Sequence, residues 1–253
     1  MRASISKPGS DRAARRRVLR TVVVLGYHKV GDPPPGSWET WYLVPEETFR
    51  RQLDDLGRHE WEVVDLERFL TGLDEPDLLP ERAALITFDD GYQSTSEAAL
   101  RVLREFGYPG VSFVPSDYIG RMNDFEADTD EPRERLCDVD DLRELERNGI
   151  SVQSHCASHR PFSSLSESEQ ADELAGSKAA LERTLGRRVD ALSYPYGDAG
   201  RNPDATARLL HRFDYRAAFL YGGGPFAAEA ADRYRLPRLA VGPDTDLAGE
   251  LGG

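Results

Sequence analysis

The sequence has few cysteines, and its basic residues are outnumbered by its acidic ones. Its 253 residues include only two cysteines, Cys137 and Cys156, which are too few for a disulfide framework and are not spaced as a zinc knuckle. It has 32 Lys and Arg against 45 Asp and Glu, a formal net charge of −13. A nucleic-acid binder needs a basic face to neutralise phosphates. The negative net charge therefore predicts that the protein has no nucleic-acid partner. The small number of cysteines predicts a reducing compartment.

Long hydrophobic runs are also missing. The first apolar run, residues 21–26, is too short for a membrane span or for the core of a signal peptide. The basic segment before it contains an arginine cluster at residues 12–20, for which we favour a solvated tail over contact with anionic lipid or nucleic acid. The sequence thus predicts a soluble, cytoplasmic protein.

The rest of the chain alternates short apolar runs with segments of helical periodicity, and it shows no internal repeat or linker. Predicted strands are residues 21–27, 61–64, 83–88, 110–114, 150–154, 190–194, 216–221 and 236–241. Helical segments lie between them, among them residues 46–59 and 96–106, and Ser166 with Glu169 forms a capping-box pattern.

This alternation predicts an α/β fold in one domain at residues 21–242, between a basic tail (1–20) and a C-terminal tail (243–253). Seven or eight mostly parallel strands in that length favour a distorted (β/α) barrel over an open sheet. An irregular acidic stretch at residues 118–136 indicates a long loop over one face. In such a barrel the active site forms at the C-terminal ends of the strands.

Two adjacent carboxylates, Asp89 and Asp90, end one apolar strand and precede Gly91. Adjacent residues of a strand point to opposite sides, so one carboxylate can bind a metal while the other acts as a base. A helix cap or a turn is the structural alternative.

Two histidines, His155 and His159, follow another strand. Their spacing places both imidazoles on one side of a helical turn, which suits a shared metal. With Asp90 they make a set of two histidines and one carboxylate that leaves positions for water and substrate. Zinc fits these ligands best, although cobalt, nickel, manganese and iron stay possible. His59 and His211, on amphipathic helices, are read as ordinary residues.

Two further strand ends carry polar groups. The segment Tyr194-Pro195-Tyr196-Gly197 breaks a strand, and the backbone N–H of Tyr196 is a candidate oxyanion donor, with a plain aromatic turn as the alternative. His28 ends the first strand and is a candidate general acid, or else a structural histidine.

Together these motifs resemble the polysaccharide deacetylases, the NodB-homology domain of carbohydrate esterase family four. The segment 87–91 (TFDDG) matches the family's first motif, Ser154-His155 with His159 the second, and 194–197 (YPYG) the third. The resemblance runs from Tyr27-His28 to the late segment 234–238 (YRLPR). It implies a distorted barrel and a metal-dependent hydrolase that removes N-acetyl, or O-acetyl, groups from a sugar or glycan.

Carried over residue by residue, the resemblance makes Asp89 the catalytic base. It makes Asp90, His155 and His159 the metal ligands, and the amide of Tyr196 an oxyanion donor. Family members often have an arginine that orients the base where this chain has Ser193, and a C-terminal Leu-x-His acid that is absent after Leu236. The chain is nearest to the poly-N-acetylglucosamine deacetylase-like subgroup, in which an N-terminal Tyr-His supplies the acid. This makes His28 the acid.

Several alternatives stay open. The same metal set serves hydrolases of small amides and imides, and the missing arginine is compatible with a carbohydrate-binding pseudoenzyme. Trp38 and Trp41 are candidates either for sugar stacking or for pinning a loop. Cys156 stands where the family usually has threonine; we favour an inert thiol over a ligand. The substrate's identity and the oligomeric state are not fixed by the sequence.

Overall fold

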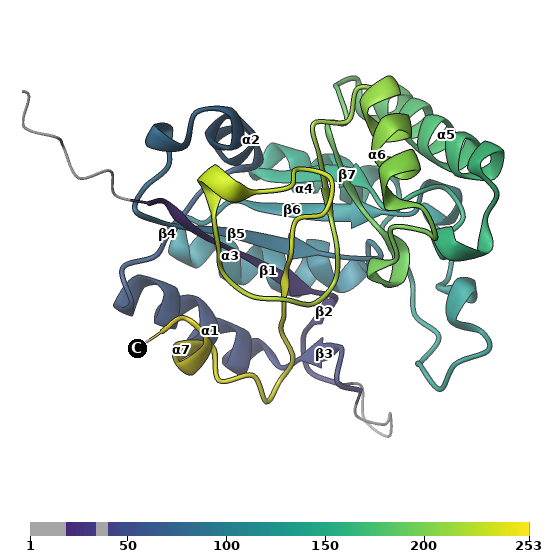
Figure 1. The fold of residues 1–253 in the computed structure, drawn as a ribbon. Coiled ribbons are helices and arrows are strands. Elements are labelled where there is room, and N and C mark those ends of the chain that lie inside the picture. Colours follow the sequence, from purple (N-terminus) through teal and green to yellow (C-terminus); the bar gives the residue numbers. More distant parts are fainter. Residues whose placement is uncertain (1–18, 34–39, 253) are drawn as a thin grey trace, which may run out of the picture.

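A computed structural model describes residues 19–33 and 40–252 (Figure 1). Most of the basic tail and Trp38 therefore lie outside the described residues. A sheet of parallel strands curls through the middle of the molecule, and helices pack around it. Six parallel strands are hydrogen-bonded in chain order: β1 (Thr21–Tyr27), β5 (Arg82–Phe88), β6 (Gly110–Val114), β7 (Ile150–Ser154), β8 (Ala191–Ser193) and β9 (Ala217–Phe219).

The segment 236–240 joins the two edges of this sheet. Leu236 pairs in parallel with Phe219 of β9, and β11 (Leu239–Ala240) pairs in parallel with β1. Two short strands extend the sheet: β4 (Glu62–Val63) is parallel to β5, and β10 (Phe226–Ala227) is antiparallel to β1. The predicted distorted (β/α) barrel of mostly parallel strands is confirmed.

The helices follow their sequence signals. They are α1 (Glu46–Arg58), α2 (Leu66–Asp74), α3 (Leu100–Phe106), α4 (Val139–Arg147), α5 (Glu167–Leu185), α6 (Pro203–Arg212) and α7 (Leu247–Glu250). The capping box of Ser166 and Glu169 begins α5, and Gly186, with φ of 69°, ends it. The helix predicted at residues 96–106 is present, but its first part is a π-helical turn, Thr95–Ala99, before α3.

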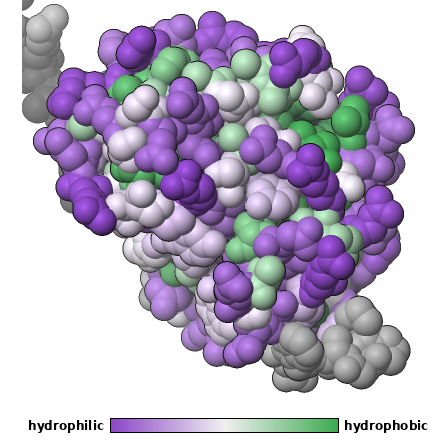
Figure 2. Space-filling model, turned by 90° about the vertical axis from the view of Figure 1, so that its right-hand side faces the viewer, coloured by the Kyte–Doolittle hydropathy of each residue, from purple (hydrophilic) through white to green (hydrophobic). Residues whose placement is uncertain are grey.

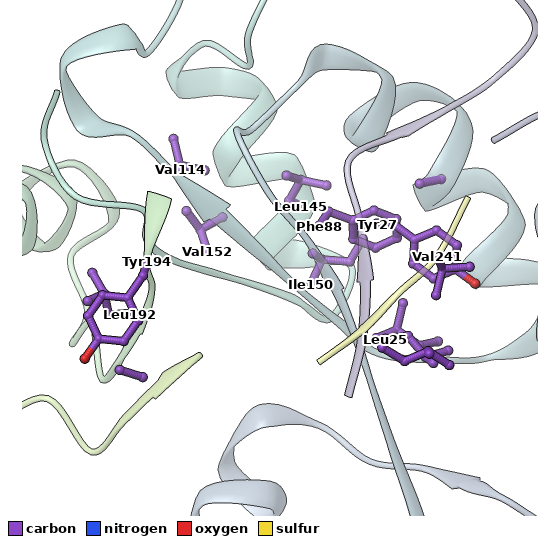
Figure 3. Packing of buried hydrophobic residues seen from close by; sticks show 14 of the residues in the cluster. Leu25, Tyr27, Phe88, Val114, Leu145, Ile150, Val152, Leu192, Tyr194 and Val241 are labelled. Atoms are coloured by element: carbon purple, nitrogen blue, oxygen red, sulfur yellow. The ribbon is translucent and has the colours of Figure 1, made fainter. Parts of the chain in front are cut away.

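The strands bury both of their faces. One set of side chains points outward and packs under the helices. Figure 3 shows part of this cluster, including Tyr27 of β1 and Phe88 of β5 together with Leu145 of α4. The alternate set points into the barrel, with Leu85, Phe113 and Phe219 among its members. Because burying one such side chain contributes about 1.5–3 kcal/mol, the two clusters fix the register of the strands.

Helix α2 closes the barrel interior at the end opposite to the C-terminal ends of the strands. Its Leu66, Phe69 and Leu70 belong to the same buried cluster as the inward side chains of β1, β5 and β6. Asp65 caps the N-terminus of α2, because its side chain accepts a hydrogen bond from the backbone N–H of Arg68. The barrel interior is therefore a packed core that opens only toward the C-terminal ends of the strands.

The structure differs from the sequence prediction in its small elements. The predicted strands at 61–64 and 236–241 shrink to β4 and β11, and a separate pair, β2 (Lys29–Val30) and β3 (Leu43–Val44), was not predicted. The segment predicted as a C-terminal tail contains α7, which packs against α1. Leu247 of α7 and Leu251, which directly follows it, are both buried. Leucines spaced by four residues bury one helical face.

The surface is mixed in character. Figure 2 shows one face on which hydrophilic residues dominate and hydrophobic residues are scattered between them. None of the helices in the described part of the chain is long and apolar enough to cross a membrane.

Candidate active site

The alternation of the strands brings polar side chains to one end of the barrel. Along β5 the inward series runs Ala83, Leu85, Thr87 and then Asp89 just past the strand. Four other strands have a polar residue in the same inward-facing phase, either in their last position or just after it. Five strand ends therefore contribute polar groups to one place. These groups are His28 after β1, Asp89 after β5, His155 after β7, Ser193 in β8 and Tyr221 after β9.

Asp90, His155 and His159 come together as a buried trio. The Oδ1 atom of Asp90 lies 3.2 Å from Nε2 of His155 and 3.0 Å from Nε2 of His159. One ligand atom from each residue lies within 4.8 Å of the others. Burial opposes the charge on Asp90, but His159 and His155 hold its pKa well below the usual value.

The trio fits a divalent metal ion. Oδ1 of Asp90 is buried and has no hydrogen-bond partner among the described residues, although two imidazole nitrogens face it. Such an arrangement is costly without a cation between the three atoms. The outer nitrogen of His155, Nδ1, lies 2.7 Å from the carbonyl oxygen of Ser193, a contact that orients the ring as in metal sites. Imidazole and carboxylate are ligands that suit zinc.

Backbone geometry corrects two sequence arguments. The histidines do not share a helical turn, because residues 155–161 form an irregular loop. Nor does strand alternation separate the two carboxylates, because Asp90 has φ of 68° and turns its side chain back toward the cavity. His159, Cys156 and Tyr196 also have positive φ. Three of the six described non-glycine residues with positive φ, namely Asp90, His159 and Tyr196, therefore line the cavity. Such strained backbone is commonly found at functional sites.

Asp89 is held by a buried arginine. Nη1 of Arg238 donates to Oδ1 of Asp89 at 2.8 Å, and Nη2 donates to Oδ2 at 2.5 Å. The hydroxyl of Ser193 also donates to Oδ2, at 3.2 Å. A carboxylate offers about four lone-pair positions, so these three donors leave one on Oδ1. Burial raises the pKa of Asp89, but the charges of Arg238 and His155 outweigh it and keep the pKa below the usual value.

Sequence reasoning missed the role of Arg238. The absence of arginine at position 193 is visible in the sequence, whereas the residue that replaces it is not. Arg238 is 0% exposed and lies just before β11, in the segment that closes the barrel. From there its guanidinium group hydrogen-bonds Asp89. The available signal was an arginine within the predicted strand 236–241, whose other residues are apolar. Its partner is 149 residues away in sequence, so no local pattern pairs them.

His28, the candidate acid, lies beside the trio. Its Nε2 is 4.0 Å from Oδ2 of Asp90, and its side chain is 15% exposed. The ring packs between Tyr42 and Tyr221, at centroid distances of 4.7 and 5.1 Å. Burial lowers the pKa of His28, and the charges of Asp90 and Asp89 only partly oppose this. The structure thus places His28 beside the trio, with Nε2 facing Asp90.

Tyr196 stands at the rim of the cavity. It lies in the short 3₁₀ turn Pro195–Gly197, where the first backbone N–H groups have no intrahelical partner. Its side chain is 56% exposed, and its ring contacts that of His159 at a centroid distance of 4.9 Å. The turn therefore sets the ring of Tyr196 at the rim of the cavity, beside His159.

A cavity of about 410 Å³ opens above these groups. Its lining includes His28, Tyr42, Asp90, His155, His159, Tyr196 and Tyr221, with Glu126, Asp130 and Glu131 on one wall. That wall belongs to the loop predicted at residues 118–136. Lys29 ties the loop down: its Nζ lies 2.9 Å from Glu131 and 3.4 Å from Glu134.

Two other candidates stay outside the chemistry. Nε1 of Trp41 donates to Asp244 at 2.8 Å, and its ring packs at Gly242, so Trp41 pins a loop and does not line the cavity. Cys156 is buried in the core, and burial raises the pKa of its thiol well above the usual value. Its sulfur is not among the clustered ligand atoms. We therefore read Cys156 as inert.

Comparison with known proteins decides the family. Residues 78–218, more than half of the chain, match the polysaccharide deacetylase family. The chain belongs to the polysaccharide deacetylases. This family membership confirms the resemblance inferred from the motifs and identifies a hydrolase that deacetylates sugar polymers. The dependence of the family on a metal agrees with the buried trio of Asp90, His155 and His159.

Individual relatives span most of this polysaccharide deacetylase. The poly-β-1,6-N-acetyl-D-glucosamine N-deacetylase of Staphylococcus epidermidis is 24% identical over 243 residues, covering 88% of this chain and 80% of the relative. The same-named protein of Staphylococcus aureus is 24% identical over 212 residues, covering 80% and 69%.

Solved structures share the fold. The Streptococcus pyogenes deacetylase PplD superposes with a TM-score of 0.78 at 20% identity, covering 93% of this chain and all of PplD. IcaB from Ammonifex degensii has a TM-score of 0.78 at 23% identity, covering 92% and 98%. Nearly the whole chain therefore shares its fold with these solved structures.

Proposed function

We propose that this polysaccharide deacetylase removes N-acetyl groups from an amino-sugar polymer, using Asp89 as the base and His28 as the acid. One observation carries the proposal: two adjacent carboxylates have separate environments. Asp89 is fixed by Arg238 with one lone pair left, whereas Asp90 faces His155 and His159. A base and a metal ligand are thus provided side by side.

Asp90, His155 and His159 are the residues that would hold the cation, which we propose to be zinc. A bound divalent ion polarises an acyl carbonyl and lowers the pKa of water toward about 7. The protein supplies the rest. The free lone pair of Asp89 accepts a proton from the attacking water, and the N–H of Tyr196 donates a hydrogen bond to the developing oxyanion.

Bond changes and protons balance in this scheme. The water oxygen forms a bond to the acyl carbon, and the bond between this carbon and nitrogen breaks. Asp89 takes one proton from water, and His28, in its protonated form, delivers one proton to the departing nitrogen. Of the described histidines outside the trio, His28 is the one that lines the cavity. The products are acetic acid and the amine of the sugar, between which a proton passes to give acetate and an ammonium group. Asp89 then releases its proton and His28 takes one up, which restores both residues.

The shape of the cavity supports a glycan over a small amide or imide. Tyr42 and Tyr196 line it with exposed fractions of 38% and 56%. Exposed aromatic rings at an open rim offer stacking surfaces for sugar rings, whereas a small nitrogenous substrate calls for a closed pocket. The name of the Staphylococcus epidermidis relative points to the same class of amide.

The test is acetate release from N-acetylglucosamine oligomers by the zinc-reconstituted protein. We expect release by the wild type, a loss on chelation, and a fall of about 10²- to 10⁴-fold in kcat for both Asp89→Asn and His28→Gln. His211→Gln, on the exposed face of α6, is the matched control and is expected to behave as the wild type. Bound zinc without acetate release from any oligomer would contradict the proposal.

A further inference from the structure

The cavity contains a buried hydroxyl that the proposed reaction does not use. Oη of Tyr221 is buried and has no hydrogen-bond partner among the described residues, although the side chain lines the cavity. The trio accounts for the unpaired Oδ1 of Asp90, because a cation takes that place. A cation at the trio does not explain the unpaired hydroxyl of Tyr221. An unpaired buried hydroxyl is costly, so the site favours a polar group at this position.

The ring of Tyr221 is held in place from several sides. The ring of His28 meets it at 83° with centroids 5.1 Å apart, and the guanidinium of Arg238 lies 5.4 Å from its centre. Its backbone is close to Gly197, where a side chain would come within 2.6 Å of the Tyr221 nitrogen. Gly26 leaves room for the ring edge, because a Cβ there would lie 3.1 Å from Cε2. These contacts pre-organise the hydroxyl for a ligand.

The position of Tyr221 points to the sugar part of the substrate. Tyr221 follows β9 in the inward-facing phase, at the end of the barrel where substrates bind. His28 lies against its ring and, in the proposed reaction, meets the departing nitrogen. A group beside His28 therefore meets the carbons next to that nitrogen, which carry hydroxyl groups in an amino sugar.

We propose that the Tyr221 hydroxyl hydrogen-bonds a ring hydroxyl of the sugar residue that carries the acyl amide. This inference rests on the proposed deacetylation and names a specificity-determining residue for it. A neutral phenol both donates and accepts a hydrogen bond, as a sugar hydroxyl does. Tyr221 thereby favours a hydroxylated ring over a plain acyl compound that the same reaction centre would cleave.

The first test compares two substrates. We expect Tyr221→Phe to lower kcat/KM for an N-acetylglucosamine oligomer by about 3- to 10-fold relative to kcat/KM for 4-nitrophenyl acetate, the loss of one neutral hydrogen bond. Tyr234→Phe is the matched control, because its hydroxyl donates to the carbonyl of Tyr215 away from the cavity. An unchanged ratio in Tyr221→Phe, whether both activities fall or neither does, would overturn the inference.

The second test locates the partner. Oligomers in which one free hydroxyl of the reacting ring is replaced by hydrogen are assayed with both proteins. For one of these analogues we expect the wild type to be less active than on the unmodified oligomer. Tyr221→Phe is expected to cleave that analogue and the unmodified oligomer equally well, because the two changes remove the same hydrogen bond. Additive losses for every analogue would refute the contact. Absence of acetate release by the wild type would instead refute the proposed function, and this inference with it.

Discussion

The site has two halves that differ in how completely the protein pairs their polar groups. In the base half, both oxygens of Asp89 accept hydrogen bonds from Arg238, and Ser193 adds a third donor. In the metal half, Oδ1 of Asp90 is buried without a hydrogen-bond partner in the described part of the chain, and the Nε2 atoms of His155 and His159 face it. The protein thus completes the base half by itself, whereas the metal half needs a cation.

The halves also differ in what supports them. Asp89, Ser193 and Arg238 stand in or next to strands of the closed sheet. His159 stands in an irregular loop, and its ring is held by Phe125 at a centroid distance of 4.1 Å and by Tyr196 at 4.9 Å. Strands fix side chains more exactly than loops do, so the base is pre-organised and the second histidine depends on its neighbours.

The largest effect is expected in the base half. Arg238→Met leaves the buried Asp89 carboxylate without its cation, which costs about 3–5 kcal/mol of the free energy of unfolding. Urea unfolding of the metal-free protein measures this loss. Arg235→Met is the control, because Arg235 pairs with Asp232 at the surface and is expected to change stability by less than about 1 kcal/mol. Equal losses in the two variants would remove the distinction between the halves.

Metal binding is expected to stabilise the other half. Zinc at about 100 times its dissociation constant raises the free energy of unfolding by about 2.7 kcal/mol, because it binds the folded state. Unfolding curves with and without zinc give this difference. His155→Ala is expected to abolish the increase. If the variant kept the full increase, the cation would have to bind elsewhere.

A smaller effect tests the packing that supports His159. Phe125→Leu removes an aromatic contact worth about 0.5–1.5 kcal/mol, so zinc affinity is expected to fall by up to about 10-fold. Competition with a chromophoric chelator measures the affinity. Phe106→Leu, in which the lost ring packs on Tyr108 outside the cavity, is the control. Identical affinities for the two variants would show that the loop does not support the metal half.

The smallest effect is expected at Ser193, a single residue that contacts both halves of the site. Ser193 contacts Asp89 through its hydroxyl and His155 through its carbonyl oxygen. Ser193→Ala removes only the hydroxyl, at a cost of about 1 kcal/mol. We expect kcat to fall by about 3- to 5-fold while zinc affinity stays as in the wild type. A change in zinc affinity as large as that in kcat would mean that the halves are not independent.

Much of this architecture could be predicted from local patterns. Apolar runs such as residues 83–88 predicted buried parallel strands, and the polar residues at their ends predicted the position of the site. The trio of Asp90, His155 and His159 came from ligand chemistry and motif order. The long loop was predicted because residues 118–136 lack periodicity.

What could not be predicted depends on chain closure and backbone conformation. The pairing of Arg238 with Asp89 exists only because the segment 236–240 closes the barrel against β1. The left-handed conformations of Asp90 and His159 leave no mark in residue type, so strand alternation and helical spacing were the wrong geometric reasons for a correct grouping. Tyr221 was in a predicted strand, but only the cavity shows its hydroxyl to be unpaired.

The division of labour between the two adjacent carboxylates is the central claim. It is tested most directly by measuring zinc affinity and acetate release together for Asp89→Asn and Asp90→Asn. We expect Asp89→Asn to bind zinc like the wild type and to release acetate at least about 10²-fold more slowly, because it lacks only the base. We expect Asp90→Asn to lose zinc binding. Wild-type zinc affinity in Asp90→Asn, or wild-type acetate release by Asp89→Asn, would contradict the account.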